Sequence, residues 1–327
     1  MEYRSLGNTG LNISTISLGT WPFGGSWGRV DEDQAMRILH RAIDLGVNLF
    51  DTADVYGDGR SERLLGQLRA ARSEPFSVAT KVGLRLEPHV ADGYTRDNLS
   101  AFIDRSLSNL RTDRIDLLQL HSPPTDVYYR PEIFAVLEDF VQEGKVAFWG
   151  VSVNRVEEGL KAIEYPIIRS VQIVYNMFRQ RPAELLFEKA KQSGVGILAR
   201  LPLASGLLSG RMNAGTSFAQ DDHRSYNRNG EKFDRGETFA GVDFETAVGA
   251  VEQLRRLVPS GVTMAQWALR WILMNDAVSC AIPGARRVEQ LEENVPASGL
   301  APLNREIMNL IDQTYKGQIR NLVHNCW

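Results

Sequence analysis

Short apolar runs alternate with segments of helical spacing along most of the chain, from about residue 16 to about residue 295. A short apolar run bounded by turn residues is typical of a buried strand, whereas apolar residues that recur every three or four positions are typical of an amphipathic helix. The pattern predicts strands at 16–19, 48–51, 77–81, 115–120, 146–151, 170–174, 196–200 and 278–282. It predicts helices at 33–45, 61–70, 95–110, 131–143, 155–163, 183–193, 262–274 and 287–296.

Eight consecutive strand–helix units predict a closed (β/α)8 barrel, the TIM-barrel architecture. Residues 3–14 are expected to form a hairpin that plugs one end of the barrel, because turn residues separate its two short strands. A long loop is expected at 209–241, which is polar and rich in glycine and has no sustained period. Two further helices are expected at 243–257 and 304–315. We find no linker, and we therefore expect one domain over 1–327.

The helix starts and the tail carry local signals. Ser61 is expected to act as an N-cap, and the stretch 95–98 offers capping oxygens that can accept a hydrogen bond from the first turn of the following helix. The tail 319–327 contains several apolar anchors and is expected to fold over the barrel mouth, with His324 and Trp327 closing the site.

Charge and cysteine content exclude some classes of partner. The 37 basic and 40 acidic residues give a net charge of −3, which favours neither nucleic acid nor an anionic membrane as a partner. Two cysteines are too few for a disulfide framework, and no apolar run approaches the roughly 20 residues of a membrane span. A signal-peptide core is absent near the N-terminus, so a cytoplasmic protein is expected. No spacing suggests a metal site, and the oligomeric state stays open.

Polar side chains stand at the carboxyl ends of several predicted strands. Asp51, Lys81 and His121 each end a strand, and Tyr56 follows Asp51 by five residues. Because the carboxyl ends of parallel barrel strands meet at one rim, we expect these four side chains to converge. Any one of them alone would be read more readily as a structural residue. Four together favour a catalytic site.

These residue types suit proton transfer. The strand that carries Lys81 is otherwise largely apolar, so its ammonium needs an anion, and Asp51 is the obvious partner. A neighbouring ammonium favours phenolate, so we expect the pKa of Tyr56 to fall from its usual value of about 10 toward working pH. Tyr56 would then act as the general acid, and His121 would orient the reacting oxygen.

The stretch from Leu49 to Gly57, followed by Ser61 and Glu62, resembles the signature of the aldo-keto reductase family. Further matches follow in order over essentially the whole chain: 78–81, 116–121, 150–152, Gln172, 202–210, 282–284 and 293–294. The resemblance implies an (α/β)8 barrel, a nicotinamide cofactor and reversible reduction of a carbonyl. It also implies Tyr56 as acid, Lys81 and Asp51 as the groups that tune it, and His121 as the guide for substrate.

A dinucleotide is expected across the barrel rim, since no Gly-x-Gly-x-x-Gly motif supports a Rossmann crevice. The small residues of 202–210 would let backbone N–H groups approach the pyrophosphate. The resemblance places the nicotinamide carboxamide on Ser152 and Gln172. This chain departs from the family in two places: Val153 separates Ser152 from Asn154, and Arg200 replaces an aromatic residue that stacks on nicotinamide in many relatives. The expected cofactor residues are Gly19, Thr20, Trp21, Asp51, Ser152, Asn154, Gln172, Arg200, Pro202, Leu203, Ser205, Gly206, Leu207, Gly210, Gly284, Arg286, Gln290, Glu293 and Asn294.

NADP(H) is favoured over NAD(H), which stays possible. Arg286 or Arg287 at a predicted helix start can meet a 2′-phosphate, although the lysine that many NADP-specific relatives carry is absent at Gly284. The alternative is that both arginines are solvated charges. The residues expected to contact substrate are Trp21, Tyr56, His121 and Tyr128. Other aromatic side chains that could line the pocket are Phe23, Trp27 and Tyr129, each of which could equally be packing.

The sequence therefore predicts an NADP(H)-dependent oxidoreductase that interconverts an aldehyde, ketone or sugar carbonyl and an alcohol. Two alternatives stay open. A desolvated barrel lysine such as Lys81 can also form a Schiff base, as in a class I aldolase. The chain could also be a non-catalytic, cofactor-binding regulatory subunit like the channel-associated members of the resembled family. The tyrosine beside the lysine and the cofactor pattern favour the oxidoreductase.

Overall fold

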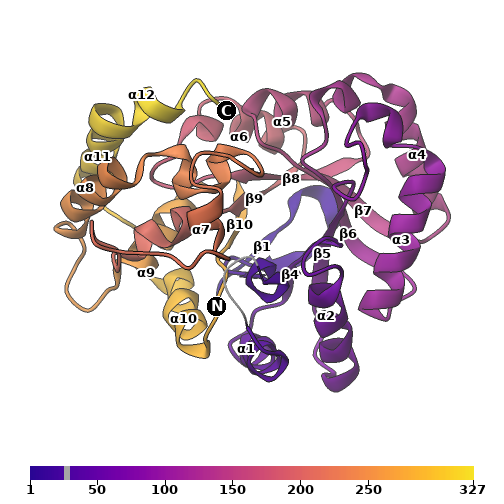
Figure 1. Ribbon diagram of the computed structural model, residues 1–327, viewed down its shortest axis with the longest axis horizontal. Coiled ribbons are helices and arrows are strands. Elements are labelled where there is room, and N and C mark those ends of the chain that lie inside the picture. Colours follow the sequence, from indigo (N-terminus) through magenta and orange to yellow (C-terminus); the bar gives the residue numbers. More distant parts are fainter. Residues whose placement is uncertain (26–29) are drawn as a thin grey trace.

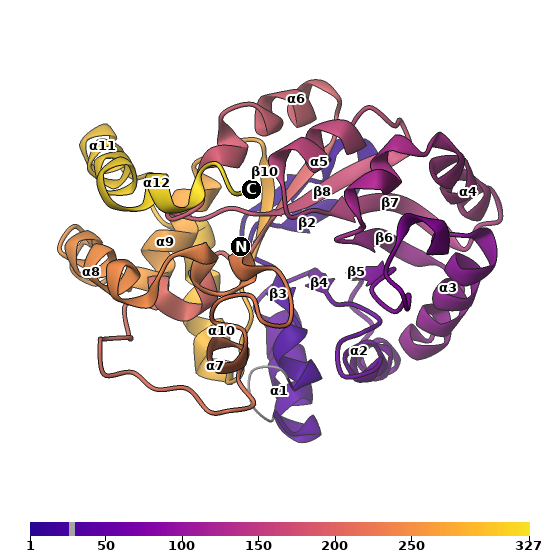
Figure 2. The same ribbon diagram turned by 45° about the horizontal axis from the view of Figure 1, so that its top comes forward.

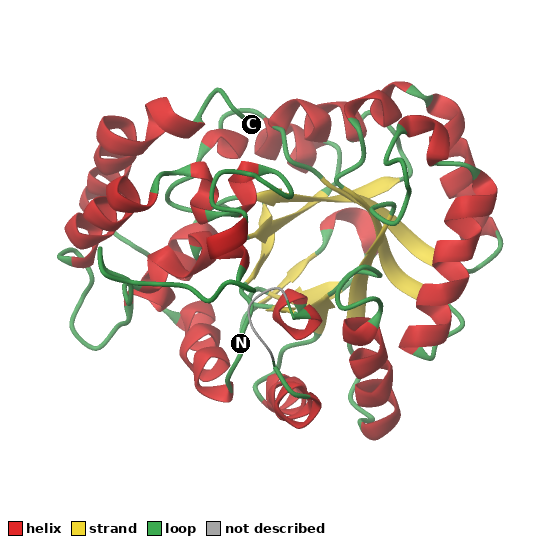
Figure 3. Cartoon of the chain, in the orientation of Figure 1, coloured by secondary structure: helices red, strands yellow, loops and turns green. Residues whose placement is uncertain are grey.

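The computed structural model describes residues 1–25 and 30–327, and its centre is a parallel barrel (Figures 1 and 3). Eight strands of the described chain pair in sequence order. Backbone bonds from Ser17 N to Ala281 O (3.0 Å) and from Gly19 N to Pro283 O (3.0 Å) join the first barrel strand to the last. The predicted barrel is confirmed. Its strands are β3 (Leu18–Gly19), β4 (Leu49–Asp51), β5 (Ser77–Val82), β6 (Ile115–His121), β7 (Val146–Ser152), β8 (Ile168–Val174), β9 (Gly196–Arg200) and β10 (Val278–Ile282).

Helices form the outer layer around these strands (Figure 1). Both sets of predicted helices are confirmed within a few residues at each end. In the part of the chain that the structure describes, no helix is long and apolar enough to cross a membrane. The helices are α1 (Glu32–Asp44), α2 (Arg60–Ala71), α3 (Arg96–Leu110), α4 (Pro131–Gln142), α5 (Val156–Ala162), α6 (Leu186–Gln192), α7 (His223–Tyr226), α8 (Phe244–Arg255), α9 (Met264–Leu273), α10 (Val288–Asn294), α11 (Arg305–Thr314) and α12 (Arg320–Val323).

Of the two helix starts with a candidate hydroxyl cap, one is capped as expected and the other is not. Thr95 caps α3 as predicted, since its Oγ1 accepts a hydrogen bond from Asn98 N (3.3 Å). The prediction for Ser61 is wrong. Helix α2 begins earlier, after Gly59, whose positive φ of 80° turns the chain into the helix. Ser61 lies within the first turn, and its Oγ donates to Thr20 Oγ1 (2.6 Å). Its hydroxyl thus ties α2 to the end of β3.

The N-terminal hairpin closes the floor of the barrel, as predicted. Strands β1 (Tyr3–Ser5) and β2 (Asn12–Ser14) pair antiparallel. Leu6 and Ile13 are buried at 0% and 1% exposure and pack with apolar side chains that the barrel strands point inward. The active rim must therefore lie at the opposite, carboxyl end of the strands, where the long loops gather.

The long segment after β9 lies over the strand ends (Figure 2). It is mostly irregular, as predicted, with α7 and three short 3-10 segments. The C-terminal tail contacts this segment, since Trp327 Nε1 donates to Asp234 Oδ1 (2.8 Å). The Trp327 indole is itself held by Arg179, which follows β8 and whose guanidinium lies 3.9 Å from the indole centroid. Only a glycine fits at Gly241, because a Cβ there would lie 2.5 Å from the Trp327 ring. The tail therefore supports the loop and does not itself close the large cavity at the rim.

Candidate active site

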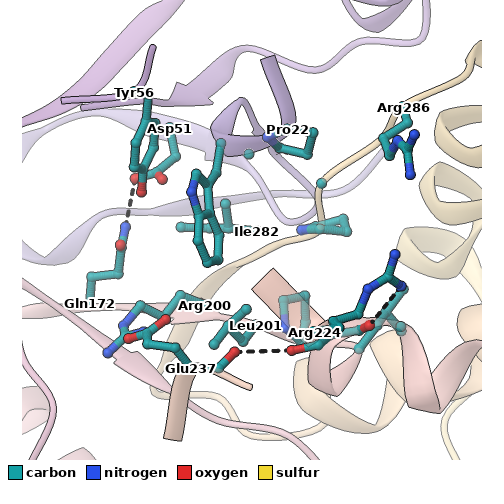
Figure 4. Close-up of a pocket in the computed structure, with 18 of the residues that line it drawn as sticks. Pro22, Asp51, Tyr56, Gln172, Arg200, Leu201, Arg224, Glu237, Ile282 and Arg286 are labelled. Atoms are coloured by element: carbon teal, nitrogen blue, oxygen red, sulfur yellow. Dashed lines mark hydrogen bonds and ion pairs between the residues drawn. The ribbon is translucent and has the colours of Figure 1, made fainter. Parts of the chain in front are cut away.

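An elongated cavity of about 800 Å³ opens at the carboxyl rim of the barrel. Its lining comes from strand ends and from the loops that follow them. Figure 4 shows Tyr56, Asp51 and Gln172 grouped at one end, with Arg224 and Arg286 toward the other. The size lies within the range of roughly 300–1,000 Å³ that is usual for ligand sites. A long cleft with different chemistry at its two ends suits a long, two-ended ligand.

A buried ion pair anchors the first end. Lys81 is 1% exposed, and its Nζ donates to Asp51 Oδ1 (2.7 Å) and to the Thr52 carbonyl (2.7 Å). Asp51 Oδ2 accepts a further bond from Gln172 Nε2 (2.6 Å). Burial lowers the pKa of Lys81, and the charge of Asp51 opposes that shift. The expected pairing is present. Both charged groups are shielded from water, and each makes a further hydrogen bond besides the ion pair.

Tyr56 stands over this pair. Lys81 Nζ lies 5.2 Å from the centroid of the Tyr56 ring, and the His121 ring lies 5.9 Å from it at an interplanar angle of 81°. Trp21 covers another side at 6.2 Å. The structure thus brings together the four side chains that the sequence places on three strand ends and one adjoining loop.

The expected lowering of the Tyr56 pKa is wrong. Burial raises the pKa of Tyr56 well above 10, and the carboxylates of Asp51 and Glu237 raise it further, with Arg200 opposing. The physical reason is that desolvation of the phenol, together with the two carboxylates, outweighs the effect of the nearby ammonium, which Lys81 directs at Asp51 and at a carbonyl. Tyr56 is therefore a neutral phenol that has a proton to give.

His121 is uncharged in this setting. Burial lowers its pKa well below the usual 6.5, and the positive charges of Lys81 and Arg200 add to the effect. Its Nδ1 is buried without a hydrogen-bond partner among the described residues. A neutral imidazole can orient an oxygen by a single hydrogen bond, but it is a poor proton donor at neutral pH.

A second ion pair crosses the same end of the cavity (Figure 4). Arg200, at the end of β9, is bonded to Glu237 from the long loop. Its Nη2 also donates to Val153 O (3.0 Å) and to Asn154 Oδ1 (2.9 Å). The guanidinium is thereby fixed by three acceptors. The side-chain oxygen of Asn154, expected to face the cofactor, is engaged in holding Arg200.

The other end of the cavity is cationic. The loop residues Pro202, Leu203, Ser205 and Gly206 line its middle, where Ser205 Oγ donates to the Glu237 carbonyl (3.0 Å). Gly206 has a φ of 94°, a backbone shape that favours glycine. Besides Arg200, the described residues contribute five lysine or arginine side chains to the cavity lining: Arg211, Arg224, Lys232, Arg286 and Arg287. These charges fit a ligand with several phosphate oxygens.

Residues at the start of α10 already have partners within the protein. Gln290 Oε1 accepts hydrogen bonds from Arg286 N (2.8 Å) and Arg287 N (3.2 Å), so it caps the helix. The Glu293 carboxylate pairs with Arg211 (2.5 Å). Both residues line the cavity, as does Asn294. The side chains of the two arginines are the groups at this helix start that stay available for an anion.

Most of the predicted residues line the cavity. Those that do are Gly19, Trp21, Asp51, Tyr56, His121, Ser152, Asn154, Gln172, Arg200, Pro202, Leu203, Ser205, Gly206, Gly284, Arg286, Gln290, Glu293 and Asn294. Lys81 does not, because it lies beneath Asp51.

Four predicted contacts are corrected. Thr20 is fully buried and donates to the Asp51 carbonyl (2.8 Å), so it stabilises the strand end. Tyr128 and Leu207 are fully buried in the hydrophobic core, and neither lines the cavity. Gly210 lies against Met264 on the outer side of the loop. Each has the position in the sequence that favours a contact, but none of the four lines the cavity.

The other aromatic candidates also fail to line the cavity where they are described. Phe23 is fully buried, and Tyr129 is 66% exposed outside the cavity. Trp27 lies outside the described residues. Sequence reasoning missed several lining residues that stand on irregular loops: Leu84, His89, Ser122, Met212, Lys232, Phe233, Asp234 and Glu237. The one available signal was their position in long segments directly after barrel strands.

Residues 15–316 match the model of the Aldo/keto reductase family. The chain belongs to the aldo-keto reductase family. An oxidoreductase of Bacillus subtilis, YqkF, is 30% identical over 98% of both chains. The L-glyceraldehyde 3-phosphate reductase of Escherichia coli K12 is 31% identical over 96% of this chain and 92% of the relative. The glycerol dehydrogenase of Gluconobacter oxydans superposes with a TM-score of 0.80 at 29% identity, covering 97% of this chain and 96% of that one.

Family membership shows that this aldo-keto reductase is an oxidoreductase. Enzymes of the family use nicotinamide cofactors and act on small carbonyl or alcohol compounds. The cavity, with Tyr56, Asp51 and Gln172 at one end and Arg286 toward the other, fits such a cofactor (Figure 4). The aldolase alternative loses its support, because its distinguishing feature was the lysine alone.

Proposed function

We propose that the protein is an NADP(H)-dependent reductase that interconverts a small aldehyde, ketone or sugar carbonyl and the corresponding alcohol, with Tyr56 exchanging the proton. One observation carries the proposal. A neutral phenol stands beside a buried Lys81–Asp51 pair and a neutral His121, all at one end of a cavity whose other end is cationic. This is the arrangement that hydride transfer coupled to proton transfer needs.

A nicotinamide cofactor, when bound, would supply the hydride. On the protein side, Gln172 and Ser152 offer polar groups at the Tyr56 end, and Arg286 and Arg287 offer charges at the far end for a 2′-phosphate. The loop over 202–206 lies between them. These features support NADP(H) as the preferred form.

The protein's own groups have separate parts in the reaction. In reduction, the Tyr56 hydroxyl proton moves to the substrate oxygen, and in oxidation it returns. His121 orients that oxygen by a hydrogen bond, which its neutral state allows. Lys81, held by Asp51, supports the charge that develops on the phenol when it gives up its proton.

The substrate end is mainly apolar with a few polar groups. Trp21, Leu84 and Phe233 contribute apolar surface, and His89 and Ser122 contribute polar atoms. The names of two relatives, a glycerol dehydrogenase and an L-glyceraldehyde 3-phosphate reductase, support a small hydroxylated carbonyl compound as the substrate class.

A substrate panel followed at the nicotinamide absorbance, with NADPH and NADH in parallel, tests the function. We expect turnover of short aldehydes or hydroxyketones and a preference for NADPH. Tight cofactor binding without turnover of any carbonyl or alcohol would instead favour the regulatory-subunit alternative.

The cofactor preference is expected to depend on the two arginines at the start of α10. In the double variant Arg286→Ala/Arg287→Ala, the Kd for NADPH should rise about 10- to 100-fold, because a charge-assisted hydrogen bond contributes roughly 1.5–3 kcal/mol. The Kd for NADH should change little. Arg305→Ala, an exposed arginine at the start of α11, is the matched control. Fluorescence titration measures both constants, and an equal loss for NADH would contradict the assignment.

Replacing the acidic partner of Arg200 should change the pH profile. In Glu237→Gln the charge of Arg200 is left uncompensated and the carboxylate that raises the pKa of Tyr56 is removed. The alkaline limb of reductase activity is therefore expected to move to lower pH by about one unit. Glu231→Gln, an exposed carboxylate in the same loop, should leave the profile unchanged. Profiles of kcat/KM against pH measure the effect. Identical profiles for the two variants would contradict the role assigned to Glu237.

A further inference from the structure

A buried carboxyl group with no hydrogen-bond partner lies in the loop that carries Tyr56. Asp54 is 0% exposed, and neither of its side-chain oxygens has a partner among the described residues. Its backbone N–H donates to the Lys81 carbonyl (3.2 Å), which fixes the loop against β5. The proposed function gives this group no part, yet burying a carboxylate without donors is costly.

Glu62, an acidic group whose charge acts on Asp54, is also fully buried. Glu62 on α2 accepts bonds from Thr80 Oγ1 (2.7 Å) and Asn109 Nδ2 (2.9 Å), both neutral donors. Thr80 and Lys81 are adjacent on β5, so the Glu62 carboxylate and the Asp54 backbone N–H contact consecutive residues of one strand. Glu62 has its oxygens satisfied, whereas Asp54 does not. Protonation therefore lowers the free-energy cost of burial more for Asp54 than for Glu62.

The cations nearby are bound elsewhere. Arg85, after β5, and Arg105, on α3, each donate to Asp58 Oδ1 at 2.7 Å. Asp58 is exposed and lies in the same loop as Asp54. The charge of Asp54 also acts on the phenols of Tyr94 and Tyr56. Burial, followed by the charge of Glu62, raises the pKa of Asp54 from 3.8 to about 7, with Arg85 and Arg105 opposing.

We infer that Asp54 carries a proton in the active protein and serves as a positioning residue for Tyr56, so that loss of this proton as the pH rises weakens the fold and slows the reaction. A neutral Asp54 packs beside Glu62 without repulsion and leaves the loop of Tyr56 in place. An ionised Asp54 adds a negative charge two residues from Tyr56, which makes the phenol a weaker acid. The effect on turnover rests on the function proposed above, whereas the protonation itself does not.

Infrared difference spectroscopy tests the protonation without any assay of activity. The full-length protein at pH 6 should show a carboxylic-acid C=O band that decreases by pH 9 and is absent from Asp54→Asn. Asp58→Asn removes the same charge from the same loop at an exposed position and should keep the band. If the band is the same in the wild type and in Asp54→Asn, Asp54 is ionised and the inference is overturned. In that case Arg105, whose Nη1 is buried without a partner among the described residues, would be the compensating charge.

Stability should follow the same titration. Since the pKa of Asp54 is higher in the folded state than in the unfolded chain, the wild type is relatively most stable below about pH 4 and loses stability as the pH rises through about 7. The Tm of Asp54→Asn should exceed that of the wild type by about 5 °C at pH 8, and the gap should close toward pH 4. A gap that does not change with pH would contradict the inference. Asp58→Asn should show no such dependence.

The pH dependence of turnover is a further readout, after the infrared band and the Tm. Between pH 6 and 8 the kcat of the wild type should fall about threefold more than that of Asp54→Asn, whereas KM should follow the same course in both. A pH effect on KM alone would indicate a different role for Asp54. An absence of turnover in every variant would count against the proposed function, and the infrared and Tm results would still decide the protonation of Asp54.

Discussion

Replacing Tyr56 with Phe is expected to lower kcat by a factor of about 10²–10⁴ while leaving the fold and cofactor affinity nearly unchanged. General acid catalysis contributes roughly that factor, and the variant removes one oxygen atom. The ring contacts with Trp21 and His121 stay in place. Circular dichroism, cofactor titration and steady-state kinetics on one preparation measure the three properties.

The control is Tyr129→Phe, which removes a hydroxyl from an exposed tyrosine outside the cavity and should leave kcat unchanged. Turnover of Tyr56→Phe close to that of the wild type would refute the assigned acid. A large loss of cofactor affinity in the same variant would instead assign the hydroxyl to binding.

The barrel could be predicted from sequence because its signals are local. Each strand is a short apolar run with a helix of clear period after it, and closure follows once eight such units stand in order. The convergence of Asp51, Lys81 and His121 follows from the same geometry, since parallel strands present their carboxyl ends at one rim. The positions of these side chains required no knowledge of the loops.

The electrostatics of the site could not be predicted in the same way. The pKa of Tyr56 depends on which carboxylates face the phenol, and one of them, Glu237, lies in a segment without period. That segment is placed by distant contacts, among them the bond between Trp327 and Asp234. The prediction that Tyr128 contacts substrate is wrong for a different reason. An aromatic residue beside a strand end can pack into the core as readily as line a pocket.

The second large effect is expected at the buried ion pair. Lys81→Met leaves the Asp51 carboxylate, 5% exposed, with one side-chain donor, Gln172. Removing one partner of a buried pair costs about 3–5 kcal/mol, so the free energy of unfolding should fall by that amount and turnover should be lost. Urea unfolding at pH 7, followed by circular dichroism, measures the stability.

A double variant separates the structural effect from the chemical one. Asp51→Asn/Lys81→Met removes both charges, so most of the lost stability should return, because no uncompensated charge stays buried. Turnover should stay lost, since no cation is left to support the charge that develops on Tyr56. Recovery of activity together with stability would mean that the pair serves the fold alone. If the double variant is no more stable than Lys81→Met, the cost lies in packing around the lysine stem and not in the orphaned carboxylate.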